Sequence, residues 1–470
     1  MVDKNSDYAR RGSTPTALSI EEIRSAFQGS VIAPGDADYD AARSAFYGGI
    51  DRHPAVIIRP LTTGEVSHVV SLARETGMEL SIRSGGHSVV GYGVSDGGIM
   101  LDLSDMRDLQ IDVEERIAWA EAGLTAGEFT NAAAAHGLVT GFGDTGSVGI
   151  GGITLGGGVG YLVRKYGLTI DDLLAAEVVT ADGQILFVDA ENHPDLFWAI
   201  RGGGGNFGVV TRFKFRLHEI GPVYGGMLFL PATPETVASF MALAEAAPDE
   251  LSAIANVMGA PPMPFIPAEH HGKLIIMAML VFLGDAETGE RVVAPFRSIA
   301  KPIADMIKPM KYPEIYPPED PSYHPVGASR TMFVDSIDRD VAEMILNRLQ
   351  SSTAMMKVSQ LRVLGGAMAR IPADATAFAH RSSKIMVNLA GLYQRPEEKA
   401  THEAWVSDFA AALEQSDHGA YVNFLGEEGP DRIRAAYPGS TWDRLVAVKT
   451  RYDPTNLFHL NQNIPPANGR

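Results

Sequence analysis

A chain of 470 residues, of which 45% are hydrophobic and 20% charged, has the composition of a globular protein and is long enough for two substantial domains. Its formal net charge of -18, without clustered lysine or arginine, argues against nucleic acid or an anionic membrane surface as a partner. The absence of cysteine excludes structural disulfides and thiolate metal sites.

The first segment, residues 1–18, is polar and predicts a loose tail. It lacks the apolar core of a secretory signal, so we expect a cytoplasmic protein. The longest apolar run, Leu274 to Leu283, has the length of a buried strand and is too short to cross a membrane.

The first half of the chain predicts short elements separated by glycine-rich turns. A helix is expected at 19–27 with Ser19 as its cap, followed by a β-α-β unit. This unit has strands at 55–58 and 79–82 around a helix at 62–76, which begins with capping-box spacing. Further on, we expect strands at 98–103, 117–122, 171–180 and 209–217, helices at 125–136 and 193–200, and a hairpin turn at 181–184.

The second strand of the β-α-β unit leads into Arg-Ser-Gly-Gly-His-Ser at 83–88, a turn suited to holding an anion. Gly85 and Gly86 have no Cβ, so successive N–H groups can point toward one place. The two serines add hydroxyl donors, and Arg83 adds positive charge. A Gly-Gly turn with one histidine is, taken alone, usually an ordinary turn.

Two further glycine-rich segments, 140–160 and 201–211, strengthen the case for a ligand. Glycine costs about 0.5–1 kcal/mol per position in a regular element, so such density is best explained by close approach of the backbone to an extended ligand. A flexible linker is the alternative for 201–211. However, this segment lies between a helical Leu-Phe-Trp-Ala-Ile and a strand, where linkers are not normally found.

The spacing G-x-G-x-x-G occurs from Gly141 and from Gly203, but neither copy fits a Rossmann site. That fingerprint follows a strand and opens a helix. At Gly203 a helix precedes and a strand follows, while Gly141 leads into more glycine. The chain has no G-x-x-x-x-G-K-[ST] loop either, which removes the common nucleotide hydrolases.

From about Gly221 longer elements alternate. Strands are expected at 224–231, 251–258, 273–283, 356–364 and 383–393, with helices from 233, within 285–300, at 336–352 and at 396–415. This pattern predicts an α+β domain with an antiparallel sheet, and the proline-rich segment 302–325 is expected to cross the surface. His270 and His271 have only Glu269 at ligand spacing, so we expect a solvated loop and no metal.

Four ordered motifs make the chain similar to the berberine bridge enzyme-like FAD-linked oxidases of the p-cresol methylhydroxylase and vanillyl-alcohol oxidase superfamily. They are Arg-Ser-Gly-Gly-His at 83–87, Val-Gly-Ile-Gly-Gly at 148–152, Gly-Gly-Gly-Gly-Asn-Phe-Gly-Val-Val-Thr at 202–211 and Asn-Gln-Asn-Ile-Pro-Pro at 461–466. The resemblance implies a two-domain α+β architecture. A PCMH-type FAD-binding domain (1–220) would be followed by a substrate domain built on an antiparallel sheet (221–420) and a segment returning to the FAD domain (421–470).

The resemblance also implies the cofactor. In the family the histidine that matches His87 carries FAD through the 8α-methyl group, and many members add a bond from a cysteine. Thr145 stands at that second position, so a single covalent link through His87 is expected and no cysteinyl link. The expected cofactor-binding residues are Arg83, Ser84, Gly85, Gly86, His87, Ser88, Thr145, Gly146, Ser147, Gly149, Gly151, Gly152, Gly208, Val210, Tyr421, Asn461 and Asn463.

Tyr421 and Asn423 are the candidate catalytic residues, since alternation on a strand would place both on one face. They are either two ordinary strand residues or, as the resemblance implies, a pair at the flavin ring. In the second case a Tyr421 of lowered pKa would take a hydroxyl proton while hydride leaves to N5. Some plant relatives carry a catalytic carboxylate at a position that falls on or near Arg362, so that base is missing here.

The expected function is an FAD-dependent oxidase. Hydride would pass to flavin N5 from an alcohol, a sugar, an amine or a secondary metabolite, and O2 would reoxidise the flavin to give hydrogen peroxide. Two alternatives stay open: a flavin dehydrogenase with another acceptor, and a flavoprotein that binds or oxygenates without alcohol or amine oxidation. The sequence names neither the substrate nor the oligomeric state.

Overall fold

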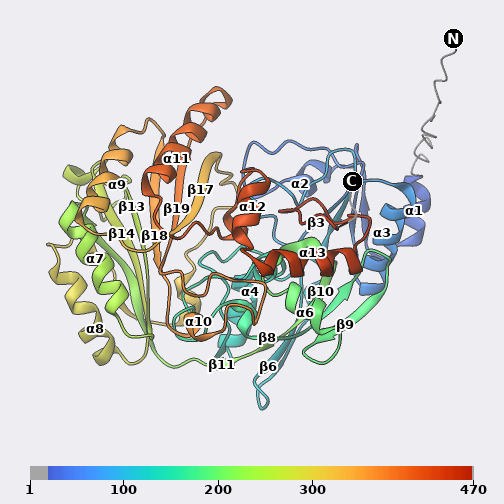
Figure 1. Ribbon diagram of the computed structural model, residues 1–470, viewed down its shortest axis with the longest axis horizontal. Helices are drawn as coiled ribbons and strands as arrows, with labels where there is room; N and C mark the ends of the chain where they lie inside the picture. Colours follow the sequence, from blue (N-terminus) through green and yellow to red (C-terminus); the bar gives the residue numbers. More distant parts are fainter. Residues whose placement is uncertain (1–18, 468–470) are drawn as a thin grey trace, which may run out of the picture.

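The structure, a computed structural model, describes residues 19–467, so the tail expected at 1–18 lies outside the described residues. Two bodies lie side by side (Figure 1). One body is built from the first part of the chain and its end, and the other from the chain between them. Within 19–467, no helix combines the length and the apolar character needed to cross a bilayer.

The first body begins with a four-stranded sheet in which three strands are parallel. Its strands lie in the order β1 (Ser30–Ile32), β2 (Val56–Arg59), β4 (Ile99–Asp102) and β3 (Leu80–Arg83). Helix α3 (Thr63–Thr76) is capped by the Thr62 side chain as expected, and its apolar stripe of Val66, Val69, Val70 and Ala73 is fully buried. The β-α-β prediction is therefore confirmed, and β3 delivers the Gly85–Gly86 turn.

A second, antiparallel sheet completes the first body. Its order is β5 (Leu109–Asp112), β6 (Ile117–Glu121), β10 (Val209–Arg216), β8 (Leu173–Val179) and β9 (Ile185–Asp189), and the short β7 (Leu138–Val139) pairs with β11 (His218–Glu219). The helices of this body are α1 (Ile20–Ala26), α2 (Tyr39–Arg43), α3, α4 (Ala126–Ala134), α5 (Ile150–Leu155), α6 (Pro194–Ala199), α12 (Pro430–Ala436) and α13 (Ser440–Tyr452). Helix α5 forms inside the glycine-rich segment 140–160, where no helix was expected.

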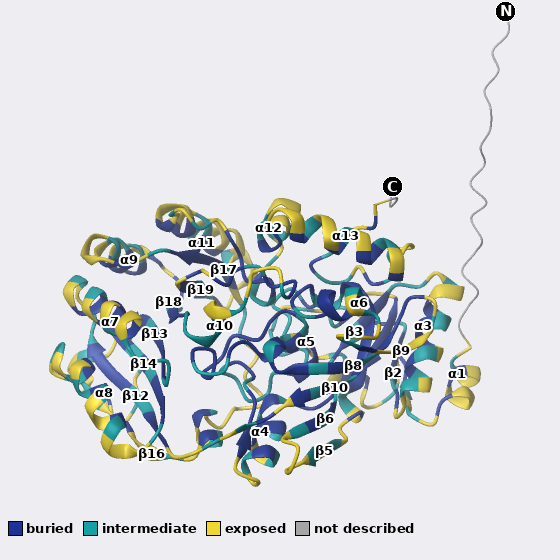
Figure 2. Cartoon of the chain, turned by 60° about the horizontal axis from the view of Figure 1, so that its bottom comes forward, coloured by how far each residue is buried: buried dark blue, intermediate teal, exposed yellow. Residues whose placement is uncertain are grey.

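The second body is an eight-stranded antiparallel sheet, as predicted for the substrate domain. The order is β15 (Ala304–Asp305), β12 (Val223–Pro231), β14 (Leu274–Leu283), β13 (Leu251–Gly259), β18 (Met356–Val363), β19 (Ile385–Leu392) and β17 (Gly327–Val334), and β16 (Lys308–Met310) also pairs with β12. Helices α7 (Pro234–Ala246), α8 (Ala286–Ser298), α9 (Arg339–Ser351) and α11 (Lys399–Leu413) cover one face, with exposed residues on their outer sides (Figure 2). The short α10 (Ala367–Arg370) follows β18.

The end of the chain packs into the core of the first body. Tyr437, Leu445, Phe458 and Ile464 join the same buried cluster as the residues of α3 and β10. Residues 422–424 form one turn of 3₁₀ helix, so the strand expected at Tyr421–Asn423 is wrong. Among residues 19–467 this segment pairs with no strand, and it lines the cavity of the first body instead.

The proline-rich segment 302–325 does not simply cross the surface. Tyr312 and Ile315 are buried in a cluster formed by both bodies, and the Tyr316 hydroxyl donates to the Phe142 carbonyl at 3.0 Å. The expectation is wrong because this connection carries large apolar side chains that the two bodies enclose. It therefore brings the residues that follow Tyr316 close to the glycine-rich wall of the first body.

Candidate functional site

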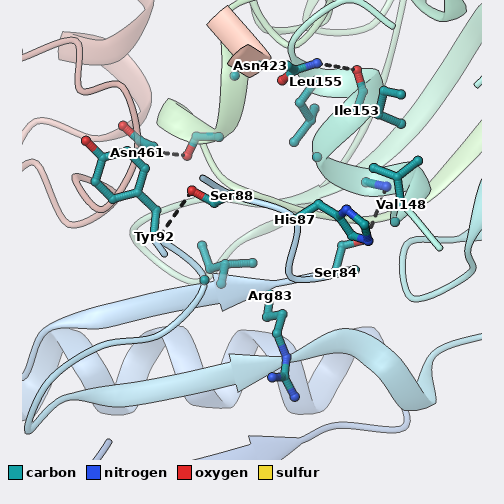
Figure 3. A pocket seen from close by; sticks show the side chains of 18 of the residues that line it. Arg83, Ser84, His87, Ser88, Tyr92, Val148, Ile153, Leu155, Asn423 and Asn461 are labelled. Atoms are coloured by element: carbon teal, nitrogen blue, oxygen red, sulfur yellow. Dashed lines mark hydrogen bonds between the residues drawn. The ribbon is translucent and has the colours of Figure 1, made fainter. Parts of the chain in front are cut away.

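A cavity of about 330 Å³ lies in the first body, where the three glycine-rich segments meet the end of the chain. Predicted site residues that line it are Arg83, Ser84, Gly85, Gly86, His87, Ser88, Thr145, Gly149, Gly151, Gly152, Gly208, Val210, Tyr421, Asn423 and Asn461. Figure 3 shows His87 and Ser88 on one turn, with Asn423 and Asn461 on two other segments around it. The fold therefore brings together motifs that are far apart in the sequence.

The first two glycine-rich segments touch through their backbones. A Cβ on Gly85 would come 2.1 Å from the Gly149 nitrogen, and a Cβ on Gly149 would come 2.2 Å from the Gly85 nitrogen. The hydroxyl of Ser84 donates to the Ala122 carbonyl at 2.6 Å and accepts the Gly151 N–H at 3.3 Å, which fastens the contact. These glycines are required first by the packing of one segment on the other, because no side chain fits between them.

Other glycines leave room for a ligand. A Cβ added to Gly152 or to Gly205 would meet nothing within 4 Å, although both residues line the cavity. Asn461 donates its amide N–H to the carbonyls of Gly205 and Phe458, both at 3.1 Å, while its buried Oδ1 has no partner among residues 19–467. Accessible backbone and an unpaired acceptor fit an extended polar cofactor such as FAD.

His87 lies at the end of this cavity in a constrained position. Its ring stacks on Phe46 with centroids 4.1 Å apart, and its Nε2 lies 2.9 Å from Ser147 Oγ. Burial lowers the pKa of His87 to about 4, although the Glu319 carboxylate acts in the opposite direction. His87 is therefore neutral at pH 7 and keeps a nitrogen lone pair, as a nucleophile requires.

Tyr421 and Asn423 do lie together, although not on a strand. The Tyr421 hydroxyl oxygen accepts the N–H of Gly158 at 3.1 Å, the N–H of Val159 at 3.2 Å and the Asn423 amide N–H at 2.9 Å. Burial raises the pKa of Tyr421 and outweighs these donors, which act to lower it. The expected lowering of this pKa is wrong, and Tyr421 is a neutral phenol at pH 7.

Arg362 stands at the boundary between the two bodies. Its Nη2 lies 2.5 Å from Asp144 Oδ2, on the cavity wall, and its Nε lies 3.0 Å from Gln360 Oε1. Alternation along β18 places Arg362 on the sheet face opposite the helices, since Leu361 and Val363 pack in the core beneath them. The carboxylate of Asp144 is thus held by a guanidinium, and it is the only carboxylate among the described residues lining the cavity.

Four of the expected residues are placed differently. The Arg83 guanidinium points away from the turn and donates to Asp102 at 2.5 Å and to the Ser44 carbonyl at 2.9 Å (Figure 3). Its positive charge neutralises the buried Asp102 carboxylate and is not directed into the cavity. Gly146 packs against Tyr316, and Ser147 binds His87 from outside the cavity wall. Asn463 also lies outside the wall, which is lined in this segment by Leu460, Asn461 and Gln462.

Sequence reasoning missed several residues of the wall and its surroundings. Tyr47 and Tyr92 line the cavity, and burial raises the pKa of both, that of Tyr47 to about 12. Asp144 lies within the second glycine-rich segment, and its charge was the one available signal there. Glu319 contacts Ser147 from the segment expected on the surface, and nothing in its sequence surroundings indicated a site.

Among residues 19–467, no three histidine, cysteine or carboxylate side chains gather so as to hold a metal ion. His271 Nε2 lies 2.9 Å from the Ile266 carbonyl in a loop.

Family models match two parts of the chain. Residues 54–189 match the FAD binding domain, and residues 420–465 match the family described as berberine and berberine like. The chain is 31% identical to the (R)-6-hydroxynicotine oxidase of Paenarthrobacter nicotinovorans, over 93% of this chain and 97% of that protein. It is 28% identical to the xylooligosaccharide oxidase of Thermothelomyces thermophilus, over 98% and 96%.

Solved structures agree with these matches. The crystal structure of 6-hydroxy-D-nicotine oxidase from Arthrobacter nicotinovorans superposes with a TM-score of 0.83 at 28% identity and covers 93% of this chain and 98% of that one. A glucooligosaccharide oxidase from Acremonium strictum, whose FAD is described as 6-S-cysteinyl and 8α-N1-histidyl, gives 0.82 over 96% and 100% at 22% identity, which shows the shared fold alone.

Proposed function

This chain belongs to the berberine bridge enzyme-like family of FAD-linked oxidases, and we propose that its substrate is a small molecule oxidised at the carbon beside a neutral amine nitrogen. One observation carries the choice of an amine: no ionised and unpaired base lines the cavity in the described structure. The enzyme is an oxidoreductase that binds FAD, as its family establishes.

An alcohol and an amine make different demands on the protein. Hydride leaves an alcohol carbon readily only when a base takes the hydroxyl proton, whereas a neutral amine assists with its own lone pair. Tyr421 is neutral and Asp144 is paired with Arg362, so neither is available as a base at pH 7. The arrangement therefore favours an amine, in accord with the relative named for hydroxynicotine.

The residues that would hold FAD follow from the cavity. Gly152 and Gly205 leave their backbone open to an extended ligand, Asn461 offers an unpaired acceptor, and Ser88 lies on the turn beside them. We place the covalent link at His87 and none at Thr145, which cannot form a thioether. When bound, the flavin accepts hydride at N5 and returns two electrons to O2, which yields hydrogen peroxide.

Tyr421 then acts as a positioned polar group on the cavity wall. Its oxygen is fixed by three N–H donors, so its own proton is free to point toward a bound molecule. A neutral phenol in this position orients the substrate and excludes water, and it does not take a proton. Asn423 holds Tyr421 in place and is itself tied to the Ile153 carbonyl at 3.0 Å.

Anaerobic mixing tests this proposal. The purified yellow protein is mixed without O2 with cyclic secondary and tertiary amines, with simple alcohols and with xylose oligosaccharides, and flavin absorbance is followed. Bleaching by amines, and peroxide release when air is admitted, would support the proposal. Bleaching by sugars or alcohols alone would reject the amine, and bleaching without peroxide in air would indicate a dehydrogenase. A flavin that none of these reduces would favour a binding or oxygenating protein.

A further inference from the structure

Glu319 belongs to the second body by sequence but contacts the histidine site of the first. One of its carboxylate oxygens accepts the Ser147 N–H at 3.0 Å, and the other accepts the Ser147 hydroxyl. Ser147 Oγ in turn lies 2.9 Å from His87 Nε2. The three side chains thus form a continuous chain from a solvent-exposed carboxylate to the half-buried imidazole.

The backbone on both sides of Glu319 is fastened to the first body. Tyr316 donates its hydroxyl to the Phe142 carbonyl, and the Gly48 N–H donates to the Pro325 carbonyl at 3.0 Å. His324 Nδ1 lies 3.1 Å from the carbonyl of Phe46, the residue whose ring stacks on His87. The carboxylate is therefore delivered to Ser147 by a segment anchored at both ends.

The polarity of this chain fixes the protonation of His87. An ionised carboxylate only accepts hydrogen bonds, and a serine hydroxyl has one proton. Ser147 gives that proton to Glu319, so its oxygen must accept from His87, and the imidazole carries its hydrogen on Nε2. The lone pair of the neutral ring is then on Nδ1, and stacking on Phe46 holds the plane of the ring.

We propose that Ser147 and Glu319 are positioning residues for the covalent attachment of FAD: they hold His87 with its Nδ1 lone pair free and conduct the Nε2 proton away during bond formation. This inference rests on the proposed link at His87. It gives the segment 316–325 a role that the hydride reaction does not use, since neither Glu319 nor Ser147 lines the cavity.

A bond forms between Nδ1 and the 8α carbon, while one C–H bond of the methyl group and the Nε2–H bond break. The two electrons stay on the flavin; one proton comes from the methyl group, and the other leaves His87 through Ser147 and Glu319 to solvent. Molecular oxygen then takes the two electrons and two protons and becomes hydrogen peroxide. Without the relay, the alkylated ring would keep a positive charge at a half-buried position, which is unfavourable.

The experiment compares wild type with Glu319→Gln, Ser147→Ala, Ser147→Thr and a matched control, Asp320→Asn. Asp320 is the adjacent carboxylate on the same segment, and it bonds only to Ser322 among the described residues. Each full-length protein is made without flavin, FAD is added in air, and samples are taken over time. Total bound FAD is measured by absorbance, and attached FAD by intact mass after acid denaturation.

We expect wild type, Ser147→Thr and Asp320→Asn to attach FAD at similar rates. Glu319→Gln and Ser147→Ala should bind FAD as completely but attach it about 100-fold more slowly, the size of a lost proton-transfer contribution. Attachment at the wild-type rate in Glu319→Gln would overturn the proposal, as would loss of total FAD binding, which would show a merely structural role. A wild type that never attaches FAD would instead reject the link at His87 itself.

Discussion

Arg362 Nη2 and Asp144 Oδ2 lie 2.5 Å apart and join the two bodies at the edge of the cavity. The side chain of Arg362 is 5% exposed and that of Asp144 is 22% exposed. A partly buried pair of this kind is costly to break from one side, because the partner is left as an unpaired charge. In the proposed mechanism the pair keeps the carboxylate of Asp144 from acting as a base.

We expect the effects of replacing Arg362 and Asp144 on the free energy of unfolding to be strongly coupled. Replacing Arg362 by alanine should lower the free energy of unfolding by about 3 kcal/mol, and the double variant with Asp144→Ala should recover part of that loss. Urea denaturation of the two single variants and the double variant measures the coupling energy. Strictly additive losses would mean that the two charges do not interact.

Tyr421→Phe should reduce kcat while FAD binding is retained. The change removes the oxygen that pairs with Gly158, Val159 and Asn423. It leaves the buried N–H groups of Gly158 and Val159 unpaired and should lower the free energy of unfolding by about 1–3 kcal/mol. Steady-state kinetics and absorbance titration measure the two effects. The control is Tyr312→Phe: the Tyr312 hydroxyl is equally buried but has no partner in residues 19–467, so this variant should keep full activity.

The pH dependence of catalysis follows from the raised pKa of Tyr421. Since burial raises this pKa above its ordinary value of about 10, Tyr421 keeps its proton throughout the neutral range. With an amine substrate, kcat/KM should therefore rise with pH only as the free amine loses its own proton. Two amines of different pKa should shift the rising limb in parallel. A limb that stays at one pH for both would reveal an enzyme base.

Asp102 is expected to be essential for the stability of the turn at 83–88, which Arg83 begins. It is completely buried and accepts from Arg83 Nη2 at 2.5 Å and from Arg59 Nε at 2.7 Å. Asp102→Asn would leave two guanidinium groups without their carboxylate and should cost about 3–5 kcal/mol. Thermal unfolding measures this loss, and Asp96→Asn, on an exposed carboxylate of the following loop, serves as the control.

The ion pairs of Asp102 also predict how the stability of the fold depends on pH. Burial acts to raise the pKa of Asp102, but the hydrogen bond and charge of Arg83 with those of Arg59 prevail and lower it. A carboxyl group whose pKa is lower in the folded state stabilises the protein above its unfolded pKa of about 4, and this contribution is lost as pH falls through the folded value. Wild type should therefore lose stability below about pH 4 more steeply than Asp102→Asn. Parallel curves for the two proteins would contradict this assignment.

A buried ion pair between Lys449 and Asp453 fastens the end of the chain to the first body. Lys449 Nζ donates to Asp453 at 2.6 Å and to the carbonyls of Asn206 and Phe458, and both charged side chains are fully buried. Lys449→Met should cost about 3–5 kcal/mol and weaken FAD binding, because Asn206 and Phe458 line the cavity. The exposed pair Lys399–Glu403 has the same spacing, and Lys399→Met should cost less than about 0.5 kcal/mol.

Much of the fold was predictable because its elements carry local signals. Thr62, Thr125 and Thr233 cap their helices as their positions indicate, and the apolar stripe of α3 is buried. Strand β17 was not predicted, because Gly-Ala-Ser-Arg-Thr at its start has little apolar alternation and its pairing depends on β19. Helix α5 was missed because glycine disfavours helices. Its N-terminal residues pack against the turn at 83–88, a contact that is distant in the sequence.

For the site, motif spacing located the cavity but not the directions of the side chains. The sequence places Arg83 next to the turn, yet its guanidinium turns away to the buried carboxylate of Asp102 on the adjacent strand, which Arg59 also binds. Likewise, the pKa of Tyr421 depends on how deeply it is buried, and Glu319 reaches Ser147 only because Tyr312 and Ile315 anchor its segment. These are consequences of long-range packing, which local patterns do not carry.

The most direct test of the account is the intact mass of the purified protein after acid denaturation, followed by peptide mapping, for wild type and for His87→Ala. We predict that wild type carries the mass of one FAD on the peptide that contains His87, and that the variant carries none on any peptide. Flavin released in full from denatured wild type, or attached at another residue, would contradict the assignment of His87.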